Sequence, residues 1–170
     1  RGRIPAEQMP AVGRSLVFAD APEWRETVAA MFARDADAPE EVKDASVRLL
    51  AGWRTSWPAR PEVVVDLAAA GFPRLVGSLA DHLAAVGRLE RATLPVHGPT
   101  TDVRELSSGE EAAMWRDRLD PTGLKAAVDG RAVLLVVDAT SSLWPITVAA
   151  SGLAQAGASV VLPLLVHRRP

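Results

Sequence analysis

Residues 133–147 place an acidic side chain, three hydroxyls and a helix start directly after a run of apolar residues. The acidic residue is Asp138, and the hydroxyls belong to Thr140, Ser141 and Ser142. The first turn of a helix has unpaired N–H groups and a positive dipole end that favour a phosphate, and small hydroxyl side chains can add to its hydrogen bonds. The stretch therefore predicts a binding loop for a phosphate, with Trp144 beside it.

The residues around this loop have the pattern of an α/β protein. The apolar run before Asp138, a segment of helical period and the apolar run 157–166 predict a strand, a helix and a second, parallel strand. A similar step starts with a strand at 62–67 and a helix that ends at Gly87, and another buried strand is expected at 92–97. We expect a mostly parallel central sheet flanked by helices, with its ligand site beyond the carboxyl ends of the strands.

The first 60 residues differ in pattern from the rest of the chain. They are rich in charge, are interrupted by prolines, and have apolar residues at helical spacing around Trp24 and again between Val42 and Trp53. We therefore expect a helical N-terminal segment over residues 1–60 and an α/β domain over residues 61–170. Residues 55–61 separate the two, since Pro58 and Pro61 prevent a helix from continuing there.

The strand, loop and helix at 133–147 resemble the ribose-phosphate motif of type I phosphoribosyltransferases. The resemblance is closest to the phosphoribosyltransferase-like domain at the C-terminal end of some bacterial RecQ-type ATP-dependent DNA helicases. Residues 2–14, 72–80 and 97–100 add to it. It implies a type I phosphoribosyltransferase-like fold, the helicase core of the same polypeptide as partner, DNA contact through that parent protein, and a cytoplasmic role in DNA repair and recombination. A chain that begins at Arg1 without a methionine fits a piece of such a protein.

The residues also depart from the family motif. Two adjacent acidic residues close the family's strand and hold the ribose hydroxyls, whereas this chain has Val137 before Asp138. In the loop, Leu143 narrows the phosphate cradle and Pro145 has no N–H to donate.

The family's pyrophosphate loop corresponds here to residues 68–74. That segment has Gly71 for the turn and Arg74 as its cation, but no hydroxyl. Diphosphate with Mg²⁺ generally requires more carboxylates, hydroxyls and cations than this loop offers. We expect no catalytic residue and no cofactor, with Mg²⁺ and phosphoribosyl diphosphate as the ligands if the pocket is active.

Nucleic-acid binding requires cations together with stacking aromatic rings. Arg54, Trp57 and Arg60 lie close together before the first expected strand, and residues 167–169 form a small basic end. Either group is a candidate DNA contact, with domain packing and a solvated tail as the competing interpretations.

Composition excludes several classes of function. The net charge is −2, with 19 basic and 21 acidic residues, so the chain as a whole does not attract nucleic acid or an anionic membrane. No cysteine is present, the three histidines lack the spacing of a helical metal pair, and no apolar run reaches the length of a membrane span. We therefore expect no metal site and no membrane association.

Three hypotheses follow for the function. The first is an accessory helicase domain with a degenerate phosphoribosyltransferase fold, which serves a structural, regulatory or partner-binding role. The second is a module that binds a nucleotide or sugar phosphate without catalysis. The third is an active phosphoribosyltransferase of unusual motif.

Overall fold

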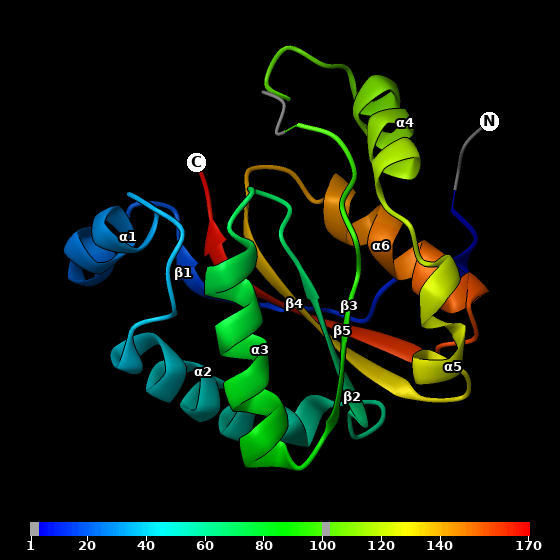
Figure 1. Cartoon of the computed structure of the whole chain (residues 1–170), viewed down its shortest axis with the longest axis horizontal. Coiled ribbons are helices and arrows are strands. Elements are labelled where there is room, and N and C mark those ends of the chain that lie inside the picture. Colours follow the sequence, from blue (N-terminus) through cyan, green and yellow to red (C-terminus); the bar gives the residue numbers. More distant parts are fainter. Residues whose placement is uncertain (1–3, 100–102) are drawn as a thin grey trace.

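A computed structural model describes residues 4–99 and 103–170, and the ends of two of the resemblance motifs lie outside these ranges. Five parallel strands form one sheet in the order β1-β5-β4-β2-β3 (Figure 1). Their bounds are β1 Arg14–Phe18, β2 Val63–Leu67, β3 Glu90–Thr93, β4 Ala132–Thr140 and β5 Val160–Arg168.

Helices cover both faces of the sheet, which explains why β2 and β4 are mostly apolar and are buried along their whole length. On one face lie α1 (Arg25–Met31), α2 (Glu40–Trp53) and α3 (Pro73–Gly87), and on the other α4 (Ser108–Arg118), α5 (Lys125–Val128) and α6 (Trp144–Gln155). Short 3-10 turns are η1 (Ala6–Gln8), η2 (Pro22–Trp24), η3 (Arg54–Ser56) and η4 (Thr122–Leu124). The expected α/β fold with a parallel central sheet is confirmed.

The N-terminal 60 residues contain the expected helices and, in addition, the edge strand β1. Strand β1 pairs with β5 in parallel, with Arg14 opposite Leu164 and Phe18 opposite Arg168. Val42 and Trp53 of α2 belong to the same buried cluster as Val64 of the sheet. A strand of five residues has little pattern of its own, and the pairing that defines it lies at the other end of the chain. The boundary at residue 60 stays a prediction.

The strand expected at 92–97 is shorter and less buried than its sequence indicated. Strand β3 spans Glu90–Thr93, lies at the sheet edge, and leaves Glu90 and Thr93 exposed. Pro95 has no N–H for a ladder, and beyond it Val96 makes a single antiparallel bridge with Leu119. The apolar residues after β3 thus pack beside α4 rather than inside the sheet.

A buried ion pair joins β2, β3 and α3. Asp66 of β2 is buried, and its Oδ1 accepts a hydrogen bond from Nη1 of Arg91 (2.8 Å) and one from Oγ1 of Thr93 (2.6 Å). Nε of Arg91 lies 2.8 Å from Oδ1 of Asp81 on α3. The carboxylate of Asp66 therefore depends on Arg91 for its charge balance.

We expect Arg91→Met to lower the free energy of unfolding by about 3 kcal/mol, because it leaves the Asp66 carboxylate buried without its cation. The double variant Asp66→Leu, Arg91→Met should recover most of that loss, since no unpaired charge remains. Arg88→Met, at an exposed arginine nearby, is the control. Urea unfolding followed by circular dichroism measures all three. A single variant as stable as the control would show that the ion pair contributes little.

Candidate functional site

The loops after β2 and β4 meet at the point where the strand order reverses. Strands β2 and β4 are neighbours, but β2 leads through α3 to β3 on one side and β4 leads through α6 to β5 on the other. Open α/β sheets bind ligands in the crevice outside such a point. The two predicted ligand loops, residues 68–74 and 139–143, are the loops that the topology brings together there.

Asp138 holds these two loops to each other. Its side chain is fully buried, and the backbone N–H of Ala70 donates to both carboxylate oxygens (3.0 and 3.1 Å). The N–H of Phe72 donates to Oδ2 (3.0 Å) and that of Ala139 to Oδ1 (2.8 Å). Asp138, the residue expected to hold a ribose, thus uses its oxygens on the backbone of the β2–α3 loop.

Burial dominates the ionisation of Asp138. Loss of hydration disfavours the charged form and raises the pKa of Asp138 to about 6, although the backbone N–H groups and the nearby Arg169 act in the opposite direction. The side chain can therefore take up a proton within the folded protein at mildly acidic pH.

The loop after β4 is closed by its own hydrogen bonds. The hydroxyl of Thr140 donates to the carbonyl of Ser142 (2.7 Å) and accepts from its N–H (3.3 Å). The N–H of Trp144 donates to the hydroxyl of Ser142 (3.3 Å), and Pro145 has none. The N–H of Trp144 at the start of α6 is consequently paired within the loop, while Ser141 makes no hydrogen bond with the described residues.

Glu111 of α4 lies on this loop. Its carboxylate is 5% exposed, and Oε2 accepts from the hydroxyl of Ser142 (2.5 Å) and from Nε1 of Trp115 (3.0 Å). A capping box between Ser107 and Glu110 starts α4 and so sets the position of Glu111 one residue later. The sequence predicted the start of this helix but not the contact of Glu111 with the loop. The only indication in the sequence is that Glu111 lies four positions before Trp115, on the same face of a helix.

A third carboxylate caps the other helix that starts at the crevice. The two oxygens of Asp35 accept from the backbone N–H groups of Arg74 and Leu75 in the first turn of α3 (3.0 Å each). The side chain of Arg74, expected to face a pyrophosphate, instead bonds through Nε to Asp37 (2.9 Å), and this contact raises the pKa of Arg74. Gly71 has φ +85°, the left-handed conformation that its predicted turn requires.

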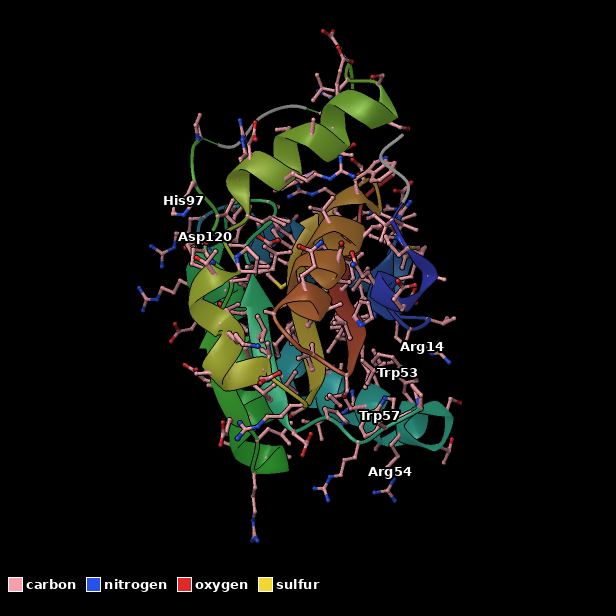
Figure 2. The ribbon with its side chains drawn as sticks, turned by 90° about the vertical axis from the view of Figure 1, so that its right-hand side faces the viewer. Arg14, Trp53, Arg54, Trp57, His97 and Asp120 are labelled. Atoms are coloured by element: carbon pink, nitrogen blue, oxygen red, sulfur yellow. The ribbon has the colours of Figure 1, made fainter. Side chains whose placement is uncertain are left out.

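The candidate DNA contacts are not near these loops. Arg54, Trp57 and Arg60 precede β2, at the amino end of the parallel strands, whereas the loops follow the carboxyl ends. Figure 2 shows Arg54 and Trp57 at the lower end of the molecule and His97 and Asp120 toward its upper end. The structure thus keeps the two predicted groups of ligand residues apart.

The histidines form no metal centre in the described part of the chain, where no group of three acidic, histidine or cysteine side chains has the right arrangement. His97 is exposed and lies 3.6 Å from Asp120, whose pKa is lowered mainly by hydrogen bonds from Thr122. His167, which was expected in a solvated tail, is buried in β5 with Nε2 3.0 Å from the carbonyl of Ala19.

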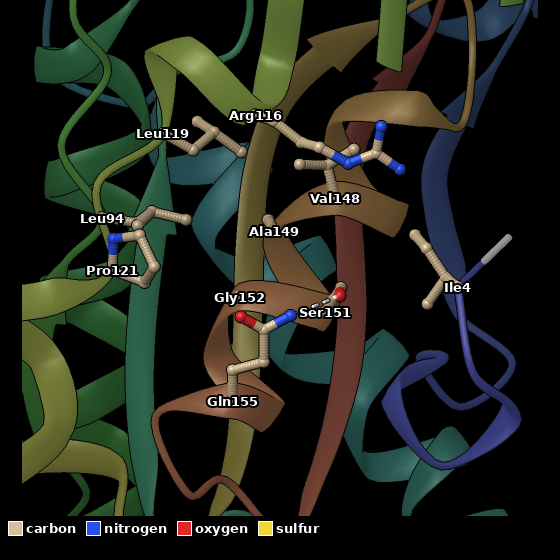
Figure 3. A pocket seen from close by; sticks show the side chains of 10 residues that line it. All are labelled: Ile4, Leu94, Arg116, Leu119, Pro121, Val148, Ala149, Ser151, Gly152 and Gln155. Atoms are coloured by element: carbon tan, nitrogen blue, oxygen red, sulfur yellow. Dashed lines mark hydrogen bonds between the residues drawn. The ribbon is translucent and has the colours of Figure 1, made fainter. Parts of the chain in front are cut away.

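Cavities lie near the crevice but do not open onto Asp138. One of about 260 Å³ lies along the outer side of α6, where Ser151 and Gln155 line it together with Ile4, Leu119 and Pro121 (Figure 3). Another of about 220 Å³ lies between the β2–α3 loop and α4 and includes Thr93 and Arg118.

We expect Asp138→Asn to alter how stability depends on pH. Because the folded state holds the Asp138 proton up to about pH 6 and the unfolded chain only to about 3.8, the folded state binds more protons between these values. The free energy of unfolding contributed by this group should therefore fall as pH rises from about 4 to 6, by about 3 kcal/mol at about 1.4 kcal/mol per pH unit.

Urea unfolding of wild type and Asp138→Asn between pH 4 and 8 measures this effect. The difference in free energy of unfolding between the two proteins should change between about pH 4 and 6 and be constant at higher pH. Parallel curves would show that Asp138 titrates alike in both states.

We expect Glu111→Gln to destabilise the chain by about 1–3 kcal/mol, because the charged acceptor for the Ser142 hydroxyl and the Trp115 indole is lost. Glu105→Gln, at an exposed residue just before the same helix, should change the free energy of unfolding little. Thermal unfolding followed by tryptophan fluorescence compares them, and equal melting temperatures would show that Glu111 does not secure the loop.

Comparison with protein families gave no match to this chain, and neither did comparison with curated proteins. Among solved structures, the allosteric regulatory enzyme of purine biosynthesis is similar over 73% of this chain, at 17% identity and a TM-score of 0.47. The chain spans 25% of that enzyme's length. In residues 4–99 and 103–170, no helix combines the length and the hydropathy of a membrane span.

Proposed function

We propose that this chain is the C-terminal accessory domain of a RecQ-type DNA helicase. In this proposal its phosphoribosyltransferase-like scaffold carries out no transfer reaction, requires no cofactor, and acts through its surface in a structural, regulatory or partner-binding role. Its first partner is the helicase core of the same polypeptide, its route to DNA is through that parent protein, and its compartment is the cytoplasm. The resemblance of residues 133–147 supports the parent assignment.

One observation carries the non-catalytic part of the proposal: the chain's own carboxylates pair with donors of both loops that a phosphorylated ligand would use. Asp35 takes the N–H groups at the start of α3, Asp138 takes those of Ala70 and Phe72, and Glu111 takes the hydroxyl of Ser142. Donors that are already paired with an internal anion have little to gain from an external one.

Electrostatic repulsion also opposes the binding of a phosphate in the crevice. A phosphate placed on the loop after β4 would lie beside the carboxyl group of Glu111 and close to Asp138, which is mainly charged above its pKa of about 6. Like charges at this range oppose binding, and the cation expected to offset them, Arg74, is paired with Asp37. The crevice therefore has the backbone arrangement of a phosphate site but lacks the free cation that was expected from Arg74.

A titration of tryptophan fluorescence with Mg²⁺ and phosphoribosyl diphosphate tests the proposal that the crevice does not bind a sugar phosphate. Trp144 lies in the loop and reports on its occupancy, and Trp144→Phe separates its signal from the other four tryptophans. We expect no saturable change at millimolar ligand and no release of pyrophosphate with any common nucleobase. Saturable quenching lost in Trp144→Phe would favour a sugar-phosphate-binding module, and pyrophosphate release an active transferase.

The parent assignment is tested on the full polypeptide that contains this chain. We expect it to hydrolyse ATP in response to DNA, and we expect a version that lacks residues 1–170 to keep that hydrolysis while its DNA unwinding changes. A full polypeptide without DNA-dependent ATP hydrolysis would overturn the helicase assignment but would not affect the proposal that the crevice is non-catalytic.

A further inference from the structure

An apolar groove of about 620 Å³ lies at the end of the sheet opposite the loops. It runs between the C-terminal halves of α2 and α3 and is closed by η3 and the segment that leads into β2. Its volume is in the range of established ligand sites. The aliphatic part of its lining includes Val47, Leu50, Ala51, Leu83, Val86 and Leu89.

Two arginines give this groove a positive edge. Arg54 and Arg60 line it, both are exposed, and neither forms an ion pair with any described residue. No aspartate or glutamate is among the lining residues. In a chain with a net charge of −2, this is a local excess of positive charge around an apolar surface.

Trp57 adds an unused hydrogen-bond donor to the groove. Its ring lines the groove and meets the ring of Trp53 edge to face, with centroids 6.0 Å apart. Nε1 of Trp57 is buried and has no partner among the described residues. Buried indole N–H groups normally have an acceptor, so the wall of the groove contains an unpaired polar group.

We propose that this groove binds an acidic amphipathic segment of a protein partner. Its aliphatic side chains would fill the groove between α2 and α3, and its carboxylates would pair with Arg54 and Arg60. Such a segment would be the partner in the surface role proposed above, and only the meaning of its binding, not the binding itself, rests on that proposed function. The groove's residues belong to neither ligand loop.

The lining favours a peptide over nucleic acid. Bases bind by stacking on open aromatic faces, whereas the aromatic residue of this groove, Trp57, is half-buried against Trp53. The rest of the floor is aliphatic and gives a sugar-phosphate backbone nothing to bind. Two arginines match a few carboxylates but supply only weak, salt-sensitive attraction to DNA.

Fluorescence anisotropy tests the proposal with a fluorescein-labelled peptide of about fifteen residues, with leucines at helical i, i+3, i+4 and i+7 spacing and glutamates elsewhere. We expect saturable binding of this peptide. Two control peptides, one with every glutamate replaced by lysine and one with every leucine replaced by serine, should not bind comparably. An oligothymidylate of the same length should not bind comparably either.

Matched variants locate the binding. The double variant Arg54→Glu, Arg60→Glu and, separately, Val86→Asp should each weaken binding at least about tenfold, because one reverses the charge and the other makes the apolar rim polar. Arg25→Glu and Val12→Asp, at exposed residues outside the groove, should leave it unchanged. Circular dichroism confirms that each variant is folded. In the wild type, nuclear magnetic resonance should show the indole N–H of Trp57 shifting more than that of Trp144.

Each other result would overturn the proposal: no binding of the glutamate peptide, equal binding of the lysine control peptide, or binding unaffected by the groove variants. Preferential, groove-dependent binding of the oligothymidylate would identify a nucleic-acid surface instead. If the chain binds the peptide but also releases pyrophosphate, the proposed accessory role is wrong and the peptide-binding inference still holds. If the chain neither binds the peptide nor releases pyrophosphate, the peptide-binding inference is wrong and the accessory role still holds.

Discussion

The arrangement of the crevice depends on one buried carboxylate. Asp138 lies near the carboxyl end of the central strand β4 and accepts hydrogen bonds from Ala70 and Phe72 across the reversal of strand order. Phe72 in turn packs its ring on Phe32, 4.9 Å between centroids, so the same contact positions the N-terminal segment against the sheet. Removing this carboxylate from water is costly, and only the N–H groups around it and the charge of Arg169 offset that cost.

This constraint explains why a fold suited to phosphate binding offers so few free donors. A loop that binds a ligand keeps its N–H groups unpaired until the ligand arrives, at a cost to the stability of the unliganded protein. Here Asp35 and Asp138 accept hydrogen bonds from backbone N–H groups of the β2–α3 segment, and Glu111 accepts one from the hydroxyl of Ser142. These internal contacts stabilise the crevice in the absence of any ligand.

The sequence predicted the elements whose pattern is local. The apolar run before Asp138 and the helical period after it gave β4, α6 and the α/β class without reference to other parts of the chain. It did not predict β1, which is defined by pairing with β5, nor the contacts of Asp35 and Glu111, which cross from distant segments. The segment predicted as a ligand loop does connect β4 to α6, but what its donors bind depends on residues that only folding brings to it.

The same distinction explains the groove. Each of its walls is an ordinary amphipathic helix, and in the sequence the apolar residues of α2 and α3 all indicate core. In the structure the C-terminal ends of the two helices leave Leu50 and Val86 facing a space that no described segment fills, with Arg54 at its edge. Since both helices are anchored by the buried cluster beneath them, the groove is preformed. A partner would gain the burial of its own apolar side chains without reordering this domain.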